Sequence, residues 1–385
     1  MRTVAIIGSG MTRFGKHHDK SVIDLMSEAV LEALALSKVD RIDGLIVGTM
    51  SPEHYENRIG IANILAGHLG VEGAIVMRAE NTSGSGGSAL YTGWLTVACG
   101  LADIVVVVGG EKMTHLSTEE NAAIIAGLVH EYERRTGVTL PSYAALVARY
   151  YLYKYNVPRE ALAYVAIKNH KNGSLNPKAH FQKEITPEDY FKSKMVADPL
   201  RVMDYAPISD GAAAVVLAPL DIASSYTSKP IVIKSIVGAT DTLVLHERED
   251  LLHLEAVRTS TQRALKEAKL TLNDVDLLEV HDMATILELI ELESMGFFPR
   301  GGSWQAVIEG YTQLDGELPV NSSGGLKSKG HPIGATGVSQ AHEVFLQMRR
   351  EAERRQVRKD VRVALSMSMG GFGNNAYTVV YEVGW

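Results

Sequence analysis

SEAVLEALALSKVDRIDGLIV, the stretch Ser27–Val47, is matched further along the chain by STQRALKEAKLTLNDVDLLEV, the stretch Ser260–Val280. The two stretches have the same length, and each predicts a helix, a short acidic connector and an apolar strand. A second pair also agrees, because Glu80–Gly93 and Asn321–Gly337 are both Ser/Gly-rich loops that open helices. Self-similarity of this kind indicates a duplicated α/β unit.

Short apolar runs alternate with amphipathic helical patterns, which is typical of an α/β fold with a largely parallel, covered sheet. We predict an N-terminal half over residues 1–220 and a C-terminal half over residues 229–385, joined by the polar linker Tyr226–Pro230. Residues 112–205 have no counterpart in the second half and predict a mainly helical insertion. The expected strands are Val4–Ile7, Gly44–Val47, Ile75–Met77, Ile104–Val108, Ala213–Leu217, Ile231–Ile236, Leu277–Val280, Pro319–Val320, Val361–Leu365 and Tyr377–Tyr381.

The composition is that of a soluble globular protein. Of the 385 residues 46% are hydrophobic and 22% are charged, and no apolar run approaches the roughly 18 to 20 residues that span a bilayer. Cys99 is the only cysteine, so we expect no disulfide and no cysteine zinc site, as suits a cytoplasmic protein. The net charge of −7 gives no overall attraction to nucleic acid or to an anionic membrane.

Three glycine-containing motifs lack the spacing of known binding and catalytic patterns. Gly8-Ser9-Gly10 has no third glycine at the spacing of a dinucleotide-binding loop, and Gly324–His331 has no Gly-Lys-Ser/Thr step of a P-loop. Ser85 lacks the preceding glycine of a Gly-x-Ser-x-Gly nucleophile turn. These patterns argue against dinucleotide binding, Walker-type NTP hydrolysis and serine hydrolase chemistry.

Ser83 and His281 are candidate reactive residues. Ser83 opens a predicted helix, whose N-terminal N–H groups and dipole stabilise negative charge. The alternative is that Ser83 or Ser85 is only a helix N-cap. His281 and Asp282 end a predicted strand, and their alternative is a structural pair or a helix cap.

His331 is the strongest candidate. It lies in Gly-His-Pro-Ile-Gly-Ala-Thr-Gly, residues 330–337, where Pro332 excludes helical backbone at His331 and the glycines allow close approach of a ligand. The glycine-rich tail Met369–Asn375 follows another strand, so its backbone N–H groups, including that of Gly371, are candidate donors. We therefore predict a functional site at this set of strand ends.

These blocks, together with SDGAAAVVL at Ser209–Leu217, resemble the motifs of the thiolase superfamily and follow the family's order. The His-Asp step at residues 281–282 and the Gly-Gly-Phe-Gly-Asn-Asn tail make the chain similar to the sterol-carrier-protein-like and archaeal acetoacetyl-CoA thiolases. The resemblance covers essentially the whole chain. It implies a five-layered α-β-α-β-α fold and a place in lipid metabolism, in the mevalonate pathway.

The resemblance also implies a reaction and its residues. Thiolases interconvert two acetyl-CoA with acetoacetyl-CoA and CoA through a covalent acyl-enzyme. Ser83 corresponds to the nucleophilic cysteine, and His331 to the histidine that activates it and shares in binding the thioester oxyanion. His281 corresponds to the second oxyanion-hole position, and backbone N–H groups near Ser83 and Gly371 to the other hole. Coenzyme A is then part of the substrate, and no cofactor or metal is permanently bound. The residues expected to contact substrate are Ser322, Gly324, Gly325 and Lys327.

Two positions depart from the family pattern. Ser83 stands in place of cysteine, and a hydroxyl is hardly ionised at pH 7, so we expect strongly reduced condensation. The places where relatives carry a cysteine base hold Met283 and Ser366–Met369, which leaves His331 and His281 as candidate bases. Three hypotheses stay open: a thiolase chain whose nucleophile has been replaced, for instance by a deliberate Cys→Ser substitution; a native CoA-ester C–C lyase of the retro-aldol type; and a non-catalytic CoA-binding subunit.

Partners follow from the resemblance as well. It implies a homodimer or tetramer, with the helix that bears Trp94 and the strand Ile104–Val108 at the two-fold interface. It also implies a complex with hydroxymethylglutaryl-CoA synthase through a zinc-ribbon and OB-fold bridging protein. Between Arg149 and Arg201 the chain has ten Lys/Arg against five acidic residues. We expect CoA-phosphate contacts there, and the alternative is a solvated helical face. The lysines concerned are Lys168, Lys171, Lys178, Lys183, Lys192 and Lys194.

Overall fold

The strands of the N-terminal half occupy five neighbouring positions of a nine-stranded sheet. The computed structural model describes all 385 residues, and the order of these strands is β3-β2-β4-β7-β1. β2 (Gly44–Gly48) pairs in parallel with β3 (Ile75–Ala79) and with β4 (Val105–Glu111). β7 (Gly211–Pro219) is antiparallel to β4 and to β1 (Val4–Met11).

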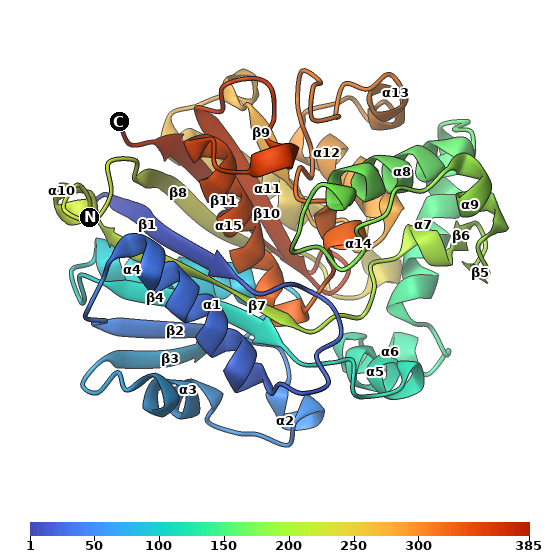
Figure 1. Cartoon of the computed structure of the whole chain (residues 1–385). Coiled ribbons are helices and arrows are strands. Elements are labelled where there is room, and N and C mark those ends of the chain that lie inside the picture. Colours follow the sequence, from blue (N-terminus) through green and yellow to red (C-terminus); the bar gives the residue numbers. More distant parts are fainter.

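The strands of the C-terminal half continue the sheet in the order β8-β11-β10-β9. β9 (Leu277–Glu279) is parallel to β10 (Val363–Gly370), while β11 (Asn375–Val383) is antiparallel to β10 and to β8 (Ile231–Thr240). Each half therefore has parallel strands at the outer side and two antiparallel strands at the inner side. The expectation of a largely parallel sheet is wrong, because the pairings that involve β1, β7, β8 and β11 are all antiparallel. The halves meet where β1 pairs with β8, as Figure 1 shows.

Helices cover the sheet in the layered arrangement that the sequence predicts. α4 (Ser85–Ala98) and α15 (Thr336–Arg349) lie in the centre and pack against strands of both halves. α1 (Val22–Ser37) and α3 (Ile61–Leu69) cover the outer face of the first half, and α11 (Glu255–Ala268) covers that of the second. The duplicated halves and the α-β-α-β-α architecture are thus confirmed (Figure 1).

The two central helices touch at their N-terminal ends. A Cβ atom on Gly86 of α4 would lie 2.7 Å from the backbone nitrogen of Gly337 of α15, and one on Gly337 would overlap the backbone of Gly87. Only glycine permits this approach. The loop before α4, which carries Ser83, is therefore held beside the loop before α15, which carries His331.

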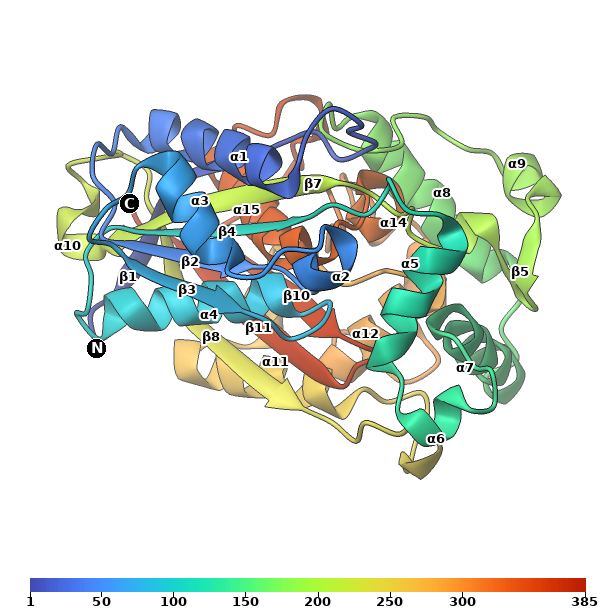
Figure 2. The same cartoon turned by 90° about the horizontal axis from the view of Figure 1, so that it is seen from below.

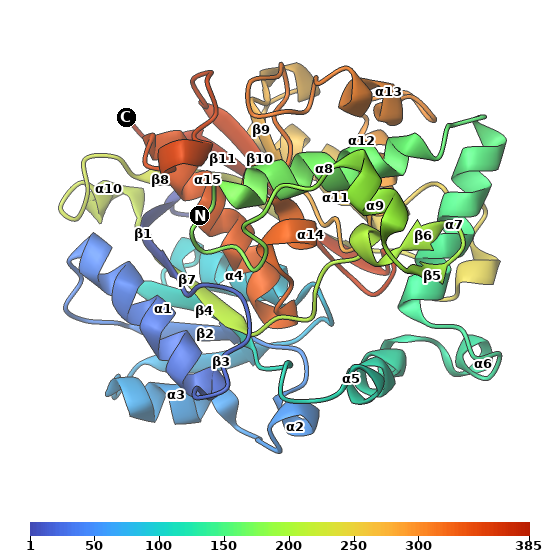
Figure 3. The same cartoon turned by 45° about the vertical axis from the view of Figure 1, so that its right-hand side comes forward.

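The segment between β4 and β7 is mainly helical. Figures 2 and 3 show its helices grouped at one end of the sheet, away from the two termini. Its elements are α5 (Thr118–Ile125), the 3-10 helix η1 (Ala126–Leu128), α6 (Glu131–Arg134), α7 (Leu140–Lys154), α8 (Glu160–Ser174), α9 (Pro187–Lys192), the short strands β5 (Met195–Ala197) and β6 (Leu200–Arg201), and η2 (Val202–Asp204).

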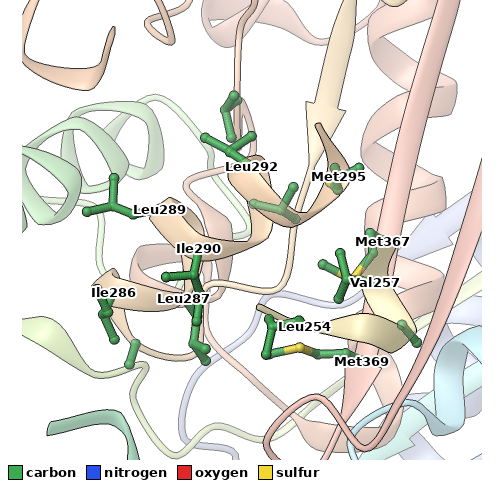
Figure 4. Packing of buried hydrophobic residues seen from close by; sticks show 14 of the residues in the cluster. Leu254, Val257, Ile286, Leu287, Leu289, Ile290, Leu292, Met295, Met367 and Met369 are labelled. Atoms are coloured by element: carbon green, nitrogen blue, oxygen red, sulfur yellow. The ribbon is translucent and has the colours of Figure 1, made fainter. Parts of the chain in front are cut away.

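The remaining elements are short, except for α12 (Thr285–Met295), which is buried along its whole length. Figure 4 shows its Leu and Ile side chains together with Leu254 and with Met367 and Met369 of β10, all of which belong to one buried hydrophobic cluster. This core fixes the segment before α12, which holds His281. The short elements are α2 (Pro52–Tyr55), α10 (Leu220–Ala223), η3 (Leu245–Glu247), η4 (Leu272–Asp274), α13 (Ser303–Ile308), α14 (Gly325–Lys329), η5 (Ile333–Ala335) and η6 (Glu353–Arg355).

Three local predictions need correction. The first strand is longer than the predicted Val4–Ile7, because β1 runs to Met11 and includes Gly8-Ser9-Gly10. Val320 forms only a single bridge with Leu278, because the expected strand is too short to form a ladder. The Ile104–Val108 run belongs to β4, which is buried between β2 and β7, so it cannot lie at a subunit interface. No helix combines the length and apolar character needed to cross a membrane.

Candidate active site

Ser83 lies in a tight turn between β3 and α4. The preceding Thr82 has a left-handed backbone with φ of 54°, an uncommon conformation that turns the chain sharply. The Ser85 hydroxyl holds the turn, since it accepts from the Asn81 N–H at 3.0 Å and donates to the Thr82 carbonyl at 2.6 Å. Gly84 is the N-cap residue of α4 and no side chain caps this helix. The Ser83 hydroxyl is thus left for other chemistry.

Two backbone N–H groups beside Ser83 have no acceptor in the protein. They belong to Ser83 itself and to Gly371, neither of which donates a backbone hydrogen bond. The two loops are in contact, because a Cβ on Gly84 would lie 3.4 Å from the Gly370 nitrogen and would overlap the Asn375 side chain. Unpaired N–H groups at such a turn are the arrangement that binds a developing oxyanion.

His331 offers an unprotonated ring nitrogen to the site. Its Nδ1 lies 2.6 Å from Thr336 Oγ1, and that hydroxyl donates to the Pro332 carbonyl at 3.3 Å. The hydroxyl must therefore accept from Nδ1–H, which leaves Nε2 as the basic nitrogen. Burial and the positive charge of Lys329 lower the pKa of His331 to about 3, so the ring is neutral at pH 7.

His281 presents the opposite tautomer. Its Nδ1 accepts from the Met369 N–H at 3.4 Å, so Nε2 carries the proton, and that buried Nε2 has no partner. Burial, His331 and Lys329 lower the pKa of His281 well below its usual range. The two rings lie 5.1 Å apart between centroids and nearly perpendicular at 89°. One ring therefore supplies a base and its neighbour supplies a free N–H donor.

Buried carboxylates hold the backbone around His281. Asp282 makes no bond to His281, because its Oδ1 accepts from the Leu326 N–H at 2.7 Å and its Oδ2 accepts from the Asn169 amide at 2.8 Å. Glu291 accepts from the backbone N–H of His281 at 2.8 Å. Burial and the nearby Asp282 raise the pKa of Glu291 well above its usual range. His281 and Asp282 thus have different surroundings, because the His281 ring faces His331, whereas the Asp282 carboxyl group accepts from backbone and amide N–H groups.

Ser83 and His331 line one cavity of about 400 Å³, together with Met283. The cavity lies between the sheet and the segment between β4 and β7, whose helices Figure 3 shows along this end of the molecule. A concave, mostly apolar cavity with a few convergent polar groups is the usual form of a small-molecule site. No group of three or more His, Cys, Asp or Glu side chains is arranged to hold a metal ion.

Comparison with known families agrees with this arrangement. The family model described as "Thiolase, N-terminal domain" matches residues 4–221, and the one described as "Thiolase C-terminal domain-like" matches residues 238–383. This chain belongs to the thiolase family. The resemblance stated from the sequence motifs is therefore confirmed.

Individual thiolase relatives match over almost the whole chain. An acetyl-CoA acetyltransferase of Methanothermobacter thermautotrophicus is 42% identical over 99% of this chain and 100% of the relative. Sterol carrier protein 2 of Gallus gallus is 31% identical over 100% of this chain and 72% of the relative. A solved structure described as an Ltp2-ChsH2(DUF35) aldolase has a TM-score of 0.84 at 23% identity, covering 99% of this chain and 98% of the other. The last likeness shows the fold alone.

Four residues expected to contact substrate do not line the cavity that holds Ser83. Each is fully or almost fully buried in the protein. The Ser322 hydroxyl donates to Glu279 at 3.0 Å and to Glu343 at 3.1 Å. A Cβ on Gly325 would collide with the Asp282 carboxylate, and one on Gly324 would collide with the Gly173 backbone. The ammonium of Lys327 lies 3.4 Å from His170. Ser322, Gly324, Gly325 and Lys327 are thus packed against neighbouring protein groups, and their contact with substrate stays a prediction.

The lysines of the basic segment between Arg149 and Arg201 are less free to bind CoA phosphates than the composition indicates. Lys168 is buried, pairs with Glu288 at 2.6 Å and donates to the Val320 carbonyl at 2.9 Å. Lys178 pairs with Glu32 and Lys192 with Glu188. For Lys168 the expected CoA contact is wrong, because its ammonium is part of the core.

Sequence reasoning missed Glu111, which anchors the His331 loop. Its Oε2 accepts from the Gly334 N–H at 3.0 Å and from the Met50 N–H at 2.8 Å, and its Oε1 accepts from the Thr49 hydroxyl at 2.9 Å. Burial raises the pKa of Glu111 to about 7, against the opposing effect of these donors. The sequence signal that could have pointed to Glu111 is a carboxylate at the end of the apolar strand β4.

Proposed function

We propose that this thiolase is an acyl-CoA acyltransferase that carries out Claisen condensation and thiolysis, interconverting two acetyl-CoA with acetoacetyl-CoA and CoA. The observation that carries the proposal is a set of complementary groups: Ser83 and His331 line one cavity, His331 and His281 present opposite tautomers, and the backbone N–H groups of Ser83 and Gly371 are unpaired. The family and the name of the archaeal relative support the same reaction type.

The first half-reaction uses Ser83 and His331. The Ser83 hydroxyl gives its proton to Nε2 of His331 as the oxygen attacks the thioester carbonyl carbon. The negative charge that develops on the carbonyl oxygen is stabilised by the unpaired N–H groups of Ser83 and Gly371. The C–S bond then breaks, and the CoA thiolate takes the proton from His331. The acyl group is left on the residue at position 83 as an ester.

The second half-reaction needs a base and an enolate stabiliser. Nε2 of His281 already carries its proton, so His281 acts as the donor to the enolate oxygen of the second acyl-CoA. Nε2 of His331 is free of protein partners and is the base left for the α-proton. The carbanion attacks the acyl carbon, and the residue at position 83 leaves with a proton.

Ser83 is a poor nucleophile for this mechanism. A cysteine has a pKa near 8.5 and is partly ionised at pH 7, whereas a serine hydroxyl is not, and a His331 with a low pKa is a poor base for it. We expect Ser83→Cys to raise CoA-dependent cleavage of acetoacetyl-CoA by at least about 100-fold. The matched control is Ser85→Cys, since Ser85 holds the turn. Equal rates for Ser83→Cys and the unchanged chain would contradict acyl transfer at this position.

A retro-aldol CoA-ester lyase is the second candidate. It needs no acyl-enzyme, so Ser83 is no obstacle to it, and the neighbour of the same fold described as an aldolase supports it. This candidate requires a β-hydroxyacyl-CoA to release an aldehyde or ketone in the unchanged chain. A chain that binds acyl-CoA but performs neither reaction would instead be a non-catalytic CoA-binding subunit.

Assembly into a homo-oligomer is part of the proposal. β3 is the edge strand of the sheet, and its Ile75 and Met77 remain 37% and 39% exposed. Exposed apolar side chains on an edge strand favour a second copy of the chain there. Light scattering at micromolar concentration tests this, with at least a dimer expected. Ile75→Lys should shift the mass to that of a monomer.

The proposed partner complex and the proposed cellular location are based on the family resemblance. The solved structure described as an Ltp2-ChsH2(DUF35) aldolase holds a partner by its description, which supports a protein partner for this chain. That this partner is a bridging protein to hydroxymethylglutaryl-CoA synthase rests on the family resemblance alone. A cytoplasmic enzyme of the mevalonate pathway would fit that assembly. Co-purification of tagged chain with these two proteins is the test.

A further inference from the structure

Glu111 places a buried carboxyl group between two loops of the site. It is the last residue of β4 and is 1% exposed. Its Oε1 accepts from the Thr49 hydroxyl at 2.9 Å and from the Ser51 N–H at 3.3 Å. Its Oε2 accepts from the N–H groups of Met50 at 2.8 Å and Gly334 at 3.0 Å. One side chain therefore ties the loop after β2 to the loop that carries the proposed base.

The Gly334 backbone is packed closely against two strand ends. A Cβ atom on Gly334 would lie 2.6 Å from the Gly48 carbonyl oxygen and 2.7 Å from that of Gly110. Gly334 belongs to η5, and the residue after η5 is Thr336, whose hydroxyl lies 2.6 Å from Nδ1 of His331. A shift of Gly334 would therefore move the group that fixes the tautomer and orientation of the His331 ring.

The donors to Glu111 are all neutral groups, namely three backbone N–H groups and one hydroxyl. The nearby Tyr55 hydroxyl of α2 is buried and has no hydrogen-bond partner. The cations of the same region are engaged elsewhere, since Lys112 pairs with Asp210 at 2.7 Å and Arg78 donates to backbone carbonyls. Burial raises the pKa of Glu111 to about 7 against the opposing effect of its donors, so this group changes charge near neutral pH.

The two histidines of the site do not change charge in that range. The pKa of His331 is about 3 and that of His281 lies well below its usual range, so both rings are neutral between pH 6 and pH 8. A carboxylate only accepts hydrogen bonds, and its bonds are roughly twice as strong as those between neutral groups. Protonation of Glu111 therefore weakens its bond to Gly334 while both rings keep their charge state.

We propose that Glu111 is a positioning residue for acyl transfer, whose ionised carboxylate fixes the His331 loop and whose protonation loosens that loop. The inference rests on the proposed function, which makes His331 the base for Ser83. Glu111 does not line the cavity of Ser83, so it acts through His331. Acyl transfer should therefore slow below neutral pH because its base is held less firmly.

Hydrogen exchange of the unchanged chain tests the loosening without any reaction. The protection of residues 330–337, corrected for the intrinsic exchange rate, is compared at pH 6 and at pH 8. We expect protection to be at least about threefold greater at pH 8, because the bond from Gly334 to the carboxylate is stronger there. Equal protection at the two pH values would overturn the proposal.

A substitution separates the charge of Glu111 from its shape. Glu111→Gln keeps the size of the side chain but not its charge, so the protection of residues 330–337 should be the same at both pH values. Glu133→Gln in α6 is the matched control, because Glu133 is also buried and accepts from Tyr143 and His246. This control should keep the pH dependence, and its loss there or its retention in Glu111→Gln would contradict the assignment. The comparison in the unchanged chain needs no variant, so it decides the question if Glu111→Gln does not fold.

Acylation rates test the link between Glu111 and the reaction. The burst rate of Ser83→Cys is divided by that of Ser83→Cys/Glu111→Gln, since both variants share any ionisation of the thiol. The ratio should be about one at pH 6 and at least about three at pH 8. A ratio that does not change with pH would indicate a purely structural role and contradict the proposal. If Ser83→Cys shows no acyl transfer at either pH, the proposed function fails, and the exchange experiment still decides whether Glu111 fixes the loop.

Discussion

The loop that carries Ser83 and the segments that carry the two histidines meet at one cavity, yet they are held by different forces. Backbone fit holds the Ser83 loop, through the left-handed Thr82 and the close approach of Gly84 to the C-terminal glycines. Buried carboxyl groups hold the histidine side, where Asp282 and Glu291 accept from backbone N–H groups. The first side should therefore be sensitive to side-chain size, and the second to charge and pH.

The largest effect is expected from breaking the charge network below the histidines. Lys168→Met leaves Glu288 buried without its cation, so the free energy of unfolding should fall by about 3 to 5 kcal/mol. Urea denaturation measures this. Lys192→Met, which removes an exposed pair with Glu188, is the matched control and should change stability by less than about 0.5 kcal/mol. A similar small change for Lys168→Met would show that buried charge does not support this side.

Removing the His331 ring should raise the activation free energy of acylation by nearly as much as the previous substitution lowers stability. In a Ser83→Cys background, His331→Ala should reduce acyl-enzyme formation by about 100- to 1,000-fold, or roughly 3 to 4 kcal/mol. His281→Ala should impair condensation more than acylation, because its Nε2–H serves the enolate. Burst-phase and steady-state rates separate the two steps. If the His331→Ala variant acylates within tenfold of the Ser83→Cys parent and melts at the same temperature, the assignment of His331 as the base is contradicted.

A larger side chain in the loop that carries Ser83 should disrupt the packing of that loop. Gly84→Ala places a methyl group against Asn375 and 3.1 Å from the Asn81 carbonyl, so we expect about 1 to 3 kcal/mol of destabilisation. Acylation in the Ser83→Cys background should also fall, since the two oxyanion donors move apart. Gly67→Ala in α3, where no atom lies within 4 Å, is the control and should be neutral or stabilising. Wild-type stability for Gly84→Ala would show that the loop is not held by fit.

The last prediction concerns how the stability of the histidine side depends on pH. Burial and then Lys327 lower the pKa of His170 to about 4, and His331 has a pKa of about 3. Unfolded histidines titrate near 6.5, so the unfolded chain binds more protons below that pH. Stability is therefore full above pH 6.5 and falls as the pH drops, by about 1.4 kcal/mol per unit for each group.

Urea midpoints between pH 7 and pH 5 measure this slope. His170→Asn should flatten it by about one group's contribution, and His68→Asn, at an exposed position of α3, should leave it unchanged. A slope that is identical in the unchanged chain and in His170→Asn would show that this buried ring does not contribute.

The sequence predicts the fold well because duplication repeats one pattern of strands and helices. It also points to Ser83, His281 and His331, since motifs place them at strand ends. It also predicts substrate contacts at Lys327 and Ser322, which are buried and do not line the cavity of Ser83. A Gly-rich loop that supports a site has the same composition as one that touches a ligand, so the sequence does not distinguish the two. The division at residues 220 and 229 and the catalytic roles stay predictions. The tautomers of the histidines could not be predicted, because they depend on Thr336 and Met369 as hydrogen-bond partners.

The seam between β1 and β8 has a consequence for biosynthesis. β1 begins at residue 4, but its two neighbours, β7 and β8, extend to residue 240. At the usual synthesis rate of about 5 to 20 residues per second, the first strand waits roughly 10 to 50 seconds before either side of it is complete. During that time an apolar strand has open edges on the ribosome. Chaperones that bind nascent apolar segments should therefore matter more for the yield of this protein than for one whose first strand pairs locally.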